Sequence, residues 1–302
     1  MSFSVERGET LCIVGESGCG KSMTALALMG LLPRRAVRRA GRLALDGIDL
    51  VAASDSAMSD LRGNRMGMIF QEPMTSLNPA YTVGNQMEEM LLRHRKVTQR
   101  EARERAVFLL EKVGITAAAS RLGQYPHQLS GGLRQRVMIA MVLMCGPDLI
   151  IADEPTTALD VTIQAQILLL LAGLRNEFGM GLVLITHDLG VVARIADRVA
   201  VMYAGQVVES GSVASVFRSP SHPYTRGLMD CIPVPGKVAR GSRLGSIPGM
   251  VPSLVGTLSG CSFRERCAYA RAGCESDIAL TADGHGNARR CILPSGEMAP
   301  AA

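Results

Sequence analysis

Tryptophan is absent from this 302-residue sequence, and only 4% of its residues are aromatic. Proteins that bind single-stranded nucleic acid stack bases on aromatic side chains, so this scarcity argues against such a function. No stretch approaches the roughly 20 apolar residues that a membrane-spanning helix needs. The N-terminal segment also lacks the basic and apolar regions of a signal peptide. We therefore expect a cytosolic globular protein that reaches a membrane only through a partner.

An excess of positive charge is also missing from most of the chain. The first 217 residues hold 22 Lys and Arg against 21 Asp and Glu, and the remainder holds ten against six. A protein that binds a nucleic-acid backbone needs clustered positive charge. Nucleic acid is therefore not expected as a partner.

Apolar strands alternate with helical segments over the first 217 residues. Strands are predicted at 11–14, 65–73, 148–155 and 181–188, with a hairpin at 198–211. This alternation predicts an α/β fold whose mainly parallel sheet is covered by helices on both faces, with a helical subdomain between the second and third strands. Beyond residue 218 the chain is rich in Pro, Gly and Ser. We therefore expect one domain at 1–217 and a small, loop-rich domain at 218–302.

A glycine-rich segment, GESGCGKS, follows the first predicted strand. It fits the phosphate-loop pattern G-x-x-x-x-G-K-[ST], in which backbone N–H groups surround the phosphates at the positive end of the next helix. Lys21 adds a positive charge, and the Ser22 hydroxyl can bind Mg²⁺. An ordinary glycine-rich turn would leave a buried Lys21 without a partner. The predicted nucleotide-binding residues are Gly15, Glu16, Ser17, Gly18, Cys19, Gly20, Lys21, Ser22 and Met23.

Two acidic residues, Asp153 and Glu154, stand at the end of a later strand. Paired acids after a strand are more often solvated loop residues. Behind a phosphate loop, one carboxylate can instead hold Mg²⁺ while its neighbour polarises an attacking water. We therefore predict that Asp153 is a magnesium ligand and that Glu154 activates water.

A second glycine-rich helix start, LSGGLRQRV, begins at Leu129. Together with IFQEP around Gln71, TTALD ending in Asp160 and ITHD containing His187, it makes residues 5–215 resemble the nucleotide-binding domain of ABC ATPases. The resemblance implies ATP and Mg²⁺ as cofactors and a head-to-tail dimer that encloses two ATP molecules. The residues that would complete the nucleotide site are Gln71, Ser130, Gly131, Gly132, Asp160 and His187.

The same resemblance implies a role for each of these residues. Glu154 would be the general base, His187 would hold the γ-phosphate, and Gln71 would bind Mg²⁺ and sense the membrane partner. Ser130, Gly131 and Gly132 would face the phosphate loop of the other subunit, and Asp160 would lie at the dimer interface. Leu133 occupies a position where many ABC proteins have Gln, which we interpret as a subfamily feature. Since Glu154 and His187 are both present, a catalytically competent half-site is expected.

An aromatic residue that stacks on adenine usually precedes the phosphate loop in this family. Only fourteen residues precede Gly15 here, and none can be assigned that role. Losing such a stacking partner would cost about 1–3 kcal/mol. The sequence therefore favours a native chain that begins upstream of Met1.

The segment between Gln71 and Ser130 separates the kinds of ABC ATPase. It is short and lacks the long coiled coils or zinc modules of DNA-repair ATPases, and the single cassette differs from the paired cassettes of translation factors. The motifs EPMTSLNP (72–79), HPYTRGLMDCIP (222–233) and IPGMVPS (247–253) resemble the ATPase subunits of oligopeptide/dipeptide permeases, a family that includes nickel importers. Peptides are therefore the expected cargo, with nickel or another small solute as the alternative.

That resemblance also implies the partners and the location. We expect a second ATPase subunit, which is identical or a paralogue, and two transmembrane permease subunits. An extracytoplasmic binding protein would deliver the substrate. The protein would lie at the cytoplasmic face of the bacterial inner membrane, as a peripheral translocase subunit.

Four of the eight cysteines, Cys261, Cys267, Cys274 and Cys291, lie near the end of the chain. The absence of a C-x-x-C pair argues against a zinc finger, and a cytosolic location disfavours disulfides. Four thiolates can hold a [4Fe–4S] cluster, which the family resemblance implies; zinc and free thiols are the alternatives. The arginines expected to offset the charge of a cluster are Arg264, Arg266, Arg271, Arg289 and Arg290. The remaining cysteines, Cys12, Cys19, Cys145 and Cys231, are expected to have no thiol chemistry.

Overall fold

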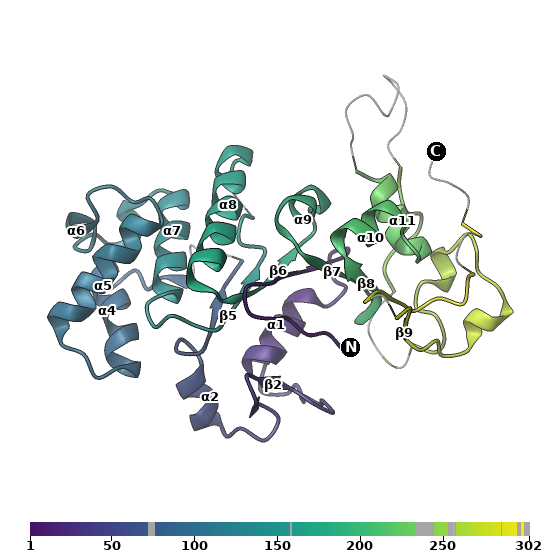
Figure 1. Ribbon diagram of the computed structural model, residues 1–302, viewed down its shortest axis with the longest axis horizontal. Helices are drawn as coiled ribbons and strands as arrows, with labels where there is room; N and C mark the ends of the chain where they lie inside the picture. Colours follow the sequence, from purple (N-terminus) through teal and green to yellow (C-terminus); the bar gives the residue numbers. More distant parts are fainter. Residues whose placement is uncertain are drawn as a thin grey trace. The chain divides into compact units, whose positions relative to one another are not determined.

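The computed structural model of the chain consists of two compact units (Figure 1). The first unit combines Met1–Val5, Thr10–Lys21 and Ile185–Ala302, and the second combines Glu6–Glu9 and Ser22–Leu184. The residues that the structure describes are 1–71, 76–157, 159–232, 245–252, 256, 258–284, 286–294 and 297–298. The domain boundary expected near residue 218 stays a prediction.

The first unit contains strands in the order β1-β7-β8-β10-β9. Their bounds are Thr10–Val14 (β1), Arg198–Tyr203 (β7), Gln206–Ser212 (β8), Thr281–Ala282 (β9) and Ala288–Arg289 (β10). β1 pairs with β7 in parallel, and the β7–β8 hairpin turns at Ala204 and Gly205, both with positive φ. The predicted hairpin at 198–211 is therefore confirmed. Leu11, Ala200 and Val207 form a buried cluster of the core here.

Short helices complete the first unit. They are α9 (Leu189–Ile195), α10 (Val213–Arg218), α11 (Pro223–Asp230) and the 3₁₀ helices η2 (Arg264–Arg266) and η3 (Ala272–Glu275). Phe263 and Cys274 are buried, although their segment has little regular structure. The described residues after α11 therefore contain little regular structure, and the small loop-rich domain expected at 218–302 stays a prediction.

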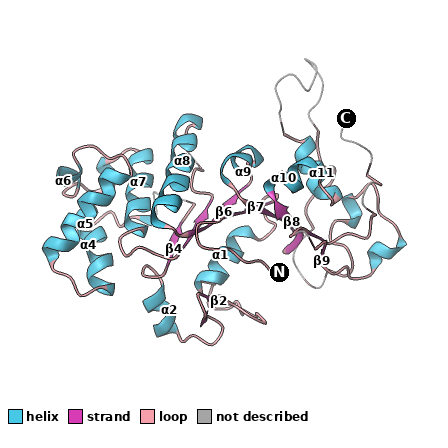
Figure 2. Ribbon diagram, viewed as in Figure 1, coloured by secondary structure: helices cyan, strands magenta, loops and turns pink. Residues whose placement is uncertain are grey.

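In the second unit β4 (Met66–Ile69) pairs in parallel with β5 (Leu149–Asp153), and the strand order continues to β6 (Gly181–Thr186), which crosses the boundary of the units at residue 184. β2 (Ala44–Leu45) and β3 (Ile48–Asp49) form a separate hairpin. The helices whose bounds the structure describes are α1 (Lys21–Met29, whose first residue belongs to the other unit), α2 (Asp55–Leu61), α4 (Val83–His94), α5 (Gln99–Lys112), α6 (Ala118–Arg121), η1 (Pro126–Gln128), α7 (Gly131–Val142) and α8 (Val161–Phe178). Parallel pairs combined with helices confirm the predicted α/β class (Figure 2).

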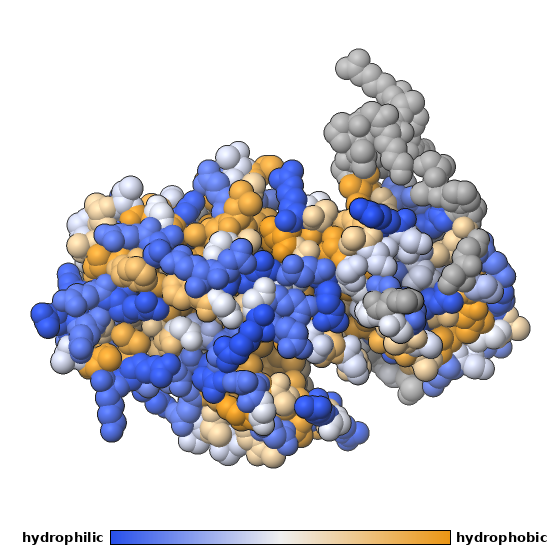
Figure 3. Space-filling model, viewed as in Figure 1, coloured by the Kyte–Doolittle hydropathy of each residue, from blue (hydrophilic) through white to orange (hydrophobic). Residues whose placement is uncertain are grey.

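Helices α4, α5 and α7 pack together and form the helical subdomain. The break between α4 and α5 has a local cause, because Thr98 and Glu101 form a capping box at the start of α5. Hydrophilic residues dominate the visible surface over α4 and α5 (Figure 3). In the described part of the chain, no helix is both long and apolar enough to cross a membrane.

Candidate functional site

The glycine-rich loop between β1 and α1 folds around the ammonium group of Lys21. Lys21 is 5% exposed, and its Nζ donates hydrogen bonds to the carbonyl oxygens of Gly15 at 2.8 Å and Glu16 at 3.0 Å. Gly18 and Gly20 have φ of +79° and +100°, values that other residues rarely adopt. The expectation that Lys21 would lack a partner without a phosphate is therefore wrong: two loop carbonyls solvate the charge.

The second unit brings four of the predicted residues into two hydrogen-bonded pairs. Ser22 Oγ donates to Asp153 Oδ1 at 3.1 Å, and Gln71 Nε2 donates to Glu154 Oε2 at 3.2 Å. Glu154 follows β5 with φ of +44°, a left-handed conformation that is costly for a residue other than glycine. Asp153 is the last residue of β5 and Glu154 follows it, so the two hydrogen-bonded pairs lie next to each other at the carboxyl end of this strand.

Thr157 is a further member of this group, and no sequence pattern predicts its contact. Its Oγ1 donates to Glu154 Oε2 at 3.0 Å, the same oxygen that Gln71 contacts. These two donors fix the Glu154 side chain. The motif TTALD contains Thr157, but only its last residue was assigned a role.

Hydroxyl, amide and carboxylate oxygens of the Ser22, Gln71 and Asp153 side chains are hard donors. Mg²⁺ prefers oxygen ligands of this kind and keeps several waters, so it needs few protein ligands. Asp153 is 5% exposed, which limits the positions from which it can reach an ion. The donor set therefore fits Mg²⁺.

The second glycine-rich motif forms the predicted helix start. α7 begins at Gly131 with Ser130 as its N-cap, and Ser130 Oγ accepts from the Leu133 N–H at 3.4 Å. Asp160 is likewise the N-cap of α8, with Oδ1 accepting from the Ile163 N–H at 2.9 Å. His187 follows β6 and is exposed in the first unit. The predicted dimer contacts of Ser130 and Asp160 stay predictions.

The four C-terminal cysteines all belong to the first unit and carry free thiols. The Cys261 N–H donates to the Cys274 carbonyl at 2.8 Å, and the Leu293 N–H donates to Cys291 Sγ at 3.4 Å. Burial is the main cause that raises the pKa of Cys261 and Cys267, and the charge of the other cysteines of the set raises both further. Among the residues that the structure describes, however, no group of three or more Cys, His, Asp or Glu side chains is placed to hold a metal ion.

The arginines expected to surround a cluster have other partners. Arg266 pairs with Glu16, Arg271 pairs with Glu297 at 2.7 Å, and Arg290 donates to the Val207 and Ile278 carbonyls. Arg264 donates to the Ser259 carbonyl at 3.4 Å. The structure therefore gives Arg264, Arg266, Arg271 and Arg290 partners other than thiolates.

The motif HPYTRGLMDCIP, described as far as residue 232, forms α11 and a buried polar network before it. His222 is the N-cap, and its Nδ1 accepts from the Tyr224 N–H at 3.1 Å. The buried Glu209 carboxylate accepts from the Ser221 and His222 N–H groups at 2.7 and 2.9 Å. The Tyr224 hydroxyl accepts from the Glu16 N–H at 2.8 Å. This motif therefore reaches the phosphate loop, a contact that no sequence pattern indicated.

Replacing His222 with Asn is expected to weaken the acid sensitivity of the fold. His222 is 1% exposed, and burial lowers the pKa of its imidazole from 6.5 to about 3. Between these pH values the unfolded chain binds a proton that the folded chain excludes, so stability present above pH 6.5 is lost as the pH falls toward 3. Asn keeps an acceptor at the N-cap but does not titrate.

The measurement is urea unfolding of both proteins at several pH values between 7 and 4. As the pH falls, the free energy of unfolding should decrease less steeply in the variant than in the wild type. The two slopes should differ by up to about 1.4 kcal/mol per pH unit. Burial raises the pKa of Glu209, but this carboxyl is present in both proteins and its contribution cancels. Identical slopes would contradict a buried neutral His222.

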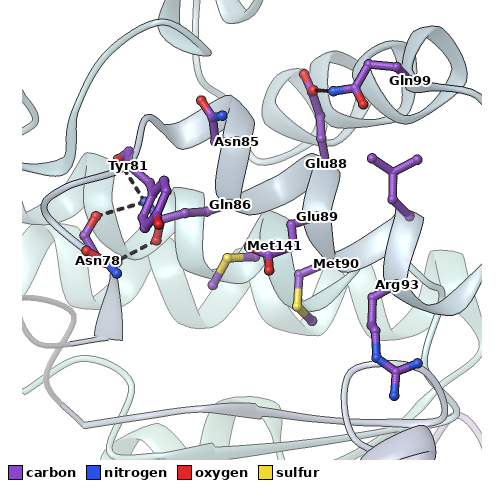
Figure 4. Close-up of a pocket in the computed structure, with 11 residues that line it drawn as sticks. Asn78, Tyr81, Asn85, Gln86, Glu88, Glu89, Met90, Arg93, Gln99 and Met141 are labelled. Carbon is purple, nitrogen blue, oxygen red and sulfur yellow. Dashed lines mark hydrogen bonds between the residues drawn. The ribbon is translucent and has the colours of Figure 1, made fainter.

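A cavity of about 890 Å³ lies beside α4 in the helical subdomain (Figure 4). Gln86 fixes one wall, since its Nε2 donates to the Asn78 and Tyr81 carbonyls at 3.1 and 3.0 Å. Glu88 is buried at the other side, accepts from Gln99 and pairs with Arg103 at 3.5 Å. Of the motif EPMTSLNP, residues 72–75 lie outside the described part of the chain, and Asn78 lines the cavity.

Comparison with known proteins gives two family matches and many relatives. The family described as ABC transporter matches residues 1–157, and the family described as oligopeptide/dipeptide transporter, C-terminal region, matches residues 208–274. A peptide import ATP-binding protein of Brucella melitensis is 54% identical over 301 residues, which covers 95% of this chain and 88% of the relative. The dipeptide transport ATP-binding protein DppD of Bacillus subtilis is 50% identical over 276 residues, covering 91% and 82%.

The solved structures that resemble this chain include a dimeric ATP-binding cassette in a post-hydrolysis state, bound to ADP and Pi. It matches with a TM-score of 0.62 and 30% sequence identity, covering 70% of this chain and 88% of that chain. The similarity thus extends from sequence to fold.

Proposed function

On the premise that this chain belongs to the ABC transporter family, and within it to the oligopeptide/dipeptide transporters, we propose which residues carry its ATPase cycle. The chain is an ATPase that powers peptide import, as the family matches and relatives support. The observation that carries the assignment of residues is the pairing of Ser22 with Asp153 and of Gln71 with Glu154.

ATP is proposed to bind at Gly15–Met23. The helix start and the loop N–H groups attract the phosphates, and Lys21 would exchange loop carbonyls for phosphate oxygens. Ser22, Gln71 and Asp153 would hold Mg²⁺, which lowers the charge on the transferring phosphoryl group.

Glu154 is proposed as the general base that takes a proton from the attacking water. Thr157 and Gln71 both donate to Oε2, so they hold the carboxylate in one orientation. His187 is proposed to contact the γ-phosphate. Because Gln71 contacts the proposed base and would itself be a ligand of Mg²⁺, a movement of its segment would change the geometry of hydrolysis.

A second ATPase subunit is proposed to complete each site. Ser130 and Gly131 are exposed and Gly132 is half-buried at the start of α7, and such a helix start suits a phosphate from the partner's nucleotide. ATP held between two helix starts would close the dimer, and hydrolysis would open it. The subunit is identical or a paralogue, and Asp160 would lie at the contact.

The cavity beside α4 is proposed to receive a cytoplasmic segment of a permease subunit. Its lining combines an exposed aromatic ring, Tyr81, with the exposed carboxylate of Glu89. Such a mixture suits a short segment with apolar and basic side chains. The protein would thus be peripheral at the cytoplasmic face of the inner membrane, with an extracytoplasmic binding protein supplying the peptide.

The experiment that tests this function is ATP-dependent uptake in vesicles that contain the permease, the binding protein and both ATPase subunits. Labelled dipeptides, longer peptides and Ni²⁺ would be compared as cargoes. Uptake of peptides that stops with Lys21→Ala supports the proposal. Uptake of Ni²⁺ alone would assign the alternative cargo, and uptake that continues with Lys21→Ala would contradict the nucleotide site.

A [4Fe–4S] cluster on Cys261, Cys267, Cys274 and Cys291 is also proposed, with zinc as the alternative. The chemistry of four free thiols in one unit fits such a cluster. Among the described residues these sulfurs form no group placed to hold a metal ion, so the proposal rests on the number and type of the ligands alone, and no step of the mechanism depends on the cluster.

Anaerobic purification is expected to give about four iron and four sulfide per chain, which are lost in Cys274→Ser, if four thiolates hold the cluster. The buried Cys12→Ser serves as a control that should retain the iron. One zinc ion per chain would favour zinc over the cluster. A metal-free protein would show that the four cysteines are free thiols.

A further inference from the structure

We propose that Arg266 of the cysteine-containing segment is a positioning residue for the phosphate loop: it neutralises Glu16 and thereby sets the affinity for ATP. The inference rests on the proposed nucleotide site at Gly15–Met23. It assigns to the C-terminal segment an influence on nucleotide binding that is argued without an iron–sulfur cluster or zinc on its cysteines.

All five N–H groups of the Arg266 guanidinium have acceptors. Nη1 and Nη2 donate to the two Glu16 carboxylate oxygens at 2.6 and 3.0 Å, an arrangement in which two parallel hydrogen bonds join the ions. The remaining three donate to the Tyr203 hydroxyl at 3.3 Å, the Ile247 carbonyl at 3.1 Å and the Pro248 carbonyl at 2.8 Å. Since arginine has no further donor, this side chain has one orientation.

The surroundings of the pair fix it further. The Arg266 side chain is 5% exposed and Glu16 is 28% exposed, so water screens the ion pair only from the Glu16 side. The guanidinium lies 5.7 and 5.9 Å from the ring centroids of Tyr203 and Phe263. Gly249 leaves room, because a Cβ there would lie 3.2 Å from Arg266 Cγ. Burial and stacking make this pair stronger than an exposed one.

The backbone of the same loop residue is held by the same part of the chain. The Glu16 N–H donates to the Tyr224 hydroxyl, and the Tyr224 ring packs on Tyr203 and Phe263 with centroids 4.6 and 5.3 Å apart. Glu16 is therefore fixed at its N–H and at its carboxylate by residues more than 200 positions away.

The charge of Glu16 explains why its contact with Arg266 should affect the affinity for ATP. Glu16 places a carboxylate in the loop that is proposed to bind the ATP phosphates, and like charges repel one another. The Arg266 guanidinium neutralises the carboxylate and links it to the hydroxyl of Tyr203, the last residue of β7. Without Arg266, the free carboxylate would oppose the phosphates, whereas Gln at position 16 would not.

The test is a double-mutant cycle on the full chain, with ATP and Mg²⁺ binding measured by titration calorimetry. Arg266→Gln is expected to weaken ATP binding about tenfold, because a buried bidentate ion pair is lost. In a Glu16→Gln background the same substitution should weaken binding less than about threefold, since no carboxylate remains to be neutralised. Arg266→Lys keeps the charge without the paired geometry and should fall between.

Steady-state kinetics give an independent measure. Arg266→Gln should raise KM for ATP with a much smaller change in kcat, whereas general damage to the fold would reduce the fraction of active protein and so lower the apparent kcat without raising KM. Arg271→Ala is the matched control, because it removes an exposed ion pair with Glu297 from the same segment and should bind ATP like the wild type.

Each remaining outcome decides between hypotheses. Equal losses of affinity from Arg266→Gln in both backgrounds would overturn the inference, since Arg266 would then not act through Glu16. Unchanged affinity in Arg266→Gln would overturn it as well. Lys21→Ala distinguishes the failure of the proposed nucleotide site, because ATP binding that survives this substitution would place the nucleotide elsewhere.

Discussion

Replacing Glu154 with Gln is expected to lower ATP hydrolysis by about 10²–10⁴-fold, the usual contribution of a general base. Gln keeps an oxygen that can accept from Thr157, so the side chain should stay in place while it can no longer take a proton. ATP binding should persist, and the ATP-bound dimer should accumulate. Phosphate release and size-exclusion chromatography in the presence of ATP measure the two effects.

A suitable control for this substitution is Glu177→Gln on α8. Glu177 is 46% exposed and pairs with Lys112 at 2.5 Å, and such surface pairs contribute little. Hydrolysis by this variant should equal that of the wild type. If Glu154→Gln hydrolysed ATP at the wild-type rate, Glu154 would not be the general base.

Gly15→Ala is expected to abolish nucleotide binding and to lower the free energy of unfolding by about 1–3 kcal/mol or more, as overpacking does. A Cβ at this position would lie 2.1 Å from the Met202 carbonyl oxygen and 3.0 Å from Cys19 Sγ. Met202 belongs to β7, whose backbone pairs with two neighbouring strands and cannot move away alone. The loop would therefore have to change shape.

For Gly15→Ala, urea unfolding measures the loss of stability and ATP titration measures the loss of nucleotide binding. Gly173→Ala on α8 is the control, because nothing lies within 4 Å of its Cβ and alanine favours a helix. Gly173→Ala should be as stable as the wild type or more so. A stable Gly15→Ala variant that binds ATP would show that the loop tolerates a side chain there.

Local features of this chain followed well from the sequence. The strands, the phosphate loop and the helix start at Gly131 depend on residues close together in the chain, whose types restrict the backbone directly. The acid pair at 153–154 also lies where the pattern placed it, at the end of β5.

Contacts between distant residues did not follow from the sequence. Glu16 and Arg266 are 250 positions apart, and no local pattern specifies such a pair. In the sequence, the motif HPYTRGLMDCIP indicates only a resemblance to the oligopeptide/dipeptide permeases. In the structure, Tyr224 of this motif contacts the phosphate loop. Lys21 was expected to need a phosphate, but two carbonyls of its own loop satisfy it.

The pairing of β10 with β8 has a consequence for the solubility of shortened forms of this protein. Ala288 and Arg289 pair with Ser210 and Glu209, and the Arg290 N–H donates to the Val208 carbonyl at 2.7 Å. Without these residues the outer side of β8 would present unpaired backbone groups next to the apolar Val207 and Val208. Exposed strand edges of this kind recruit other chains and lead to aggregation. A fragment that ends after β8 would therefore self-associate even though its phosphate loop is complete.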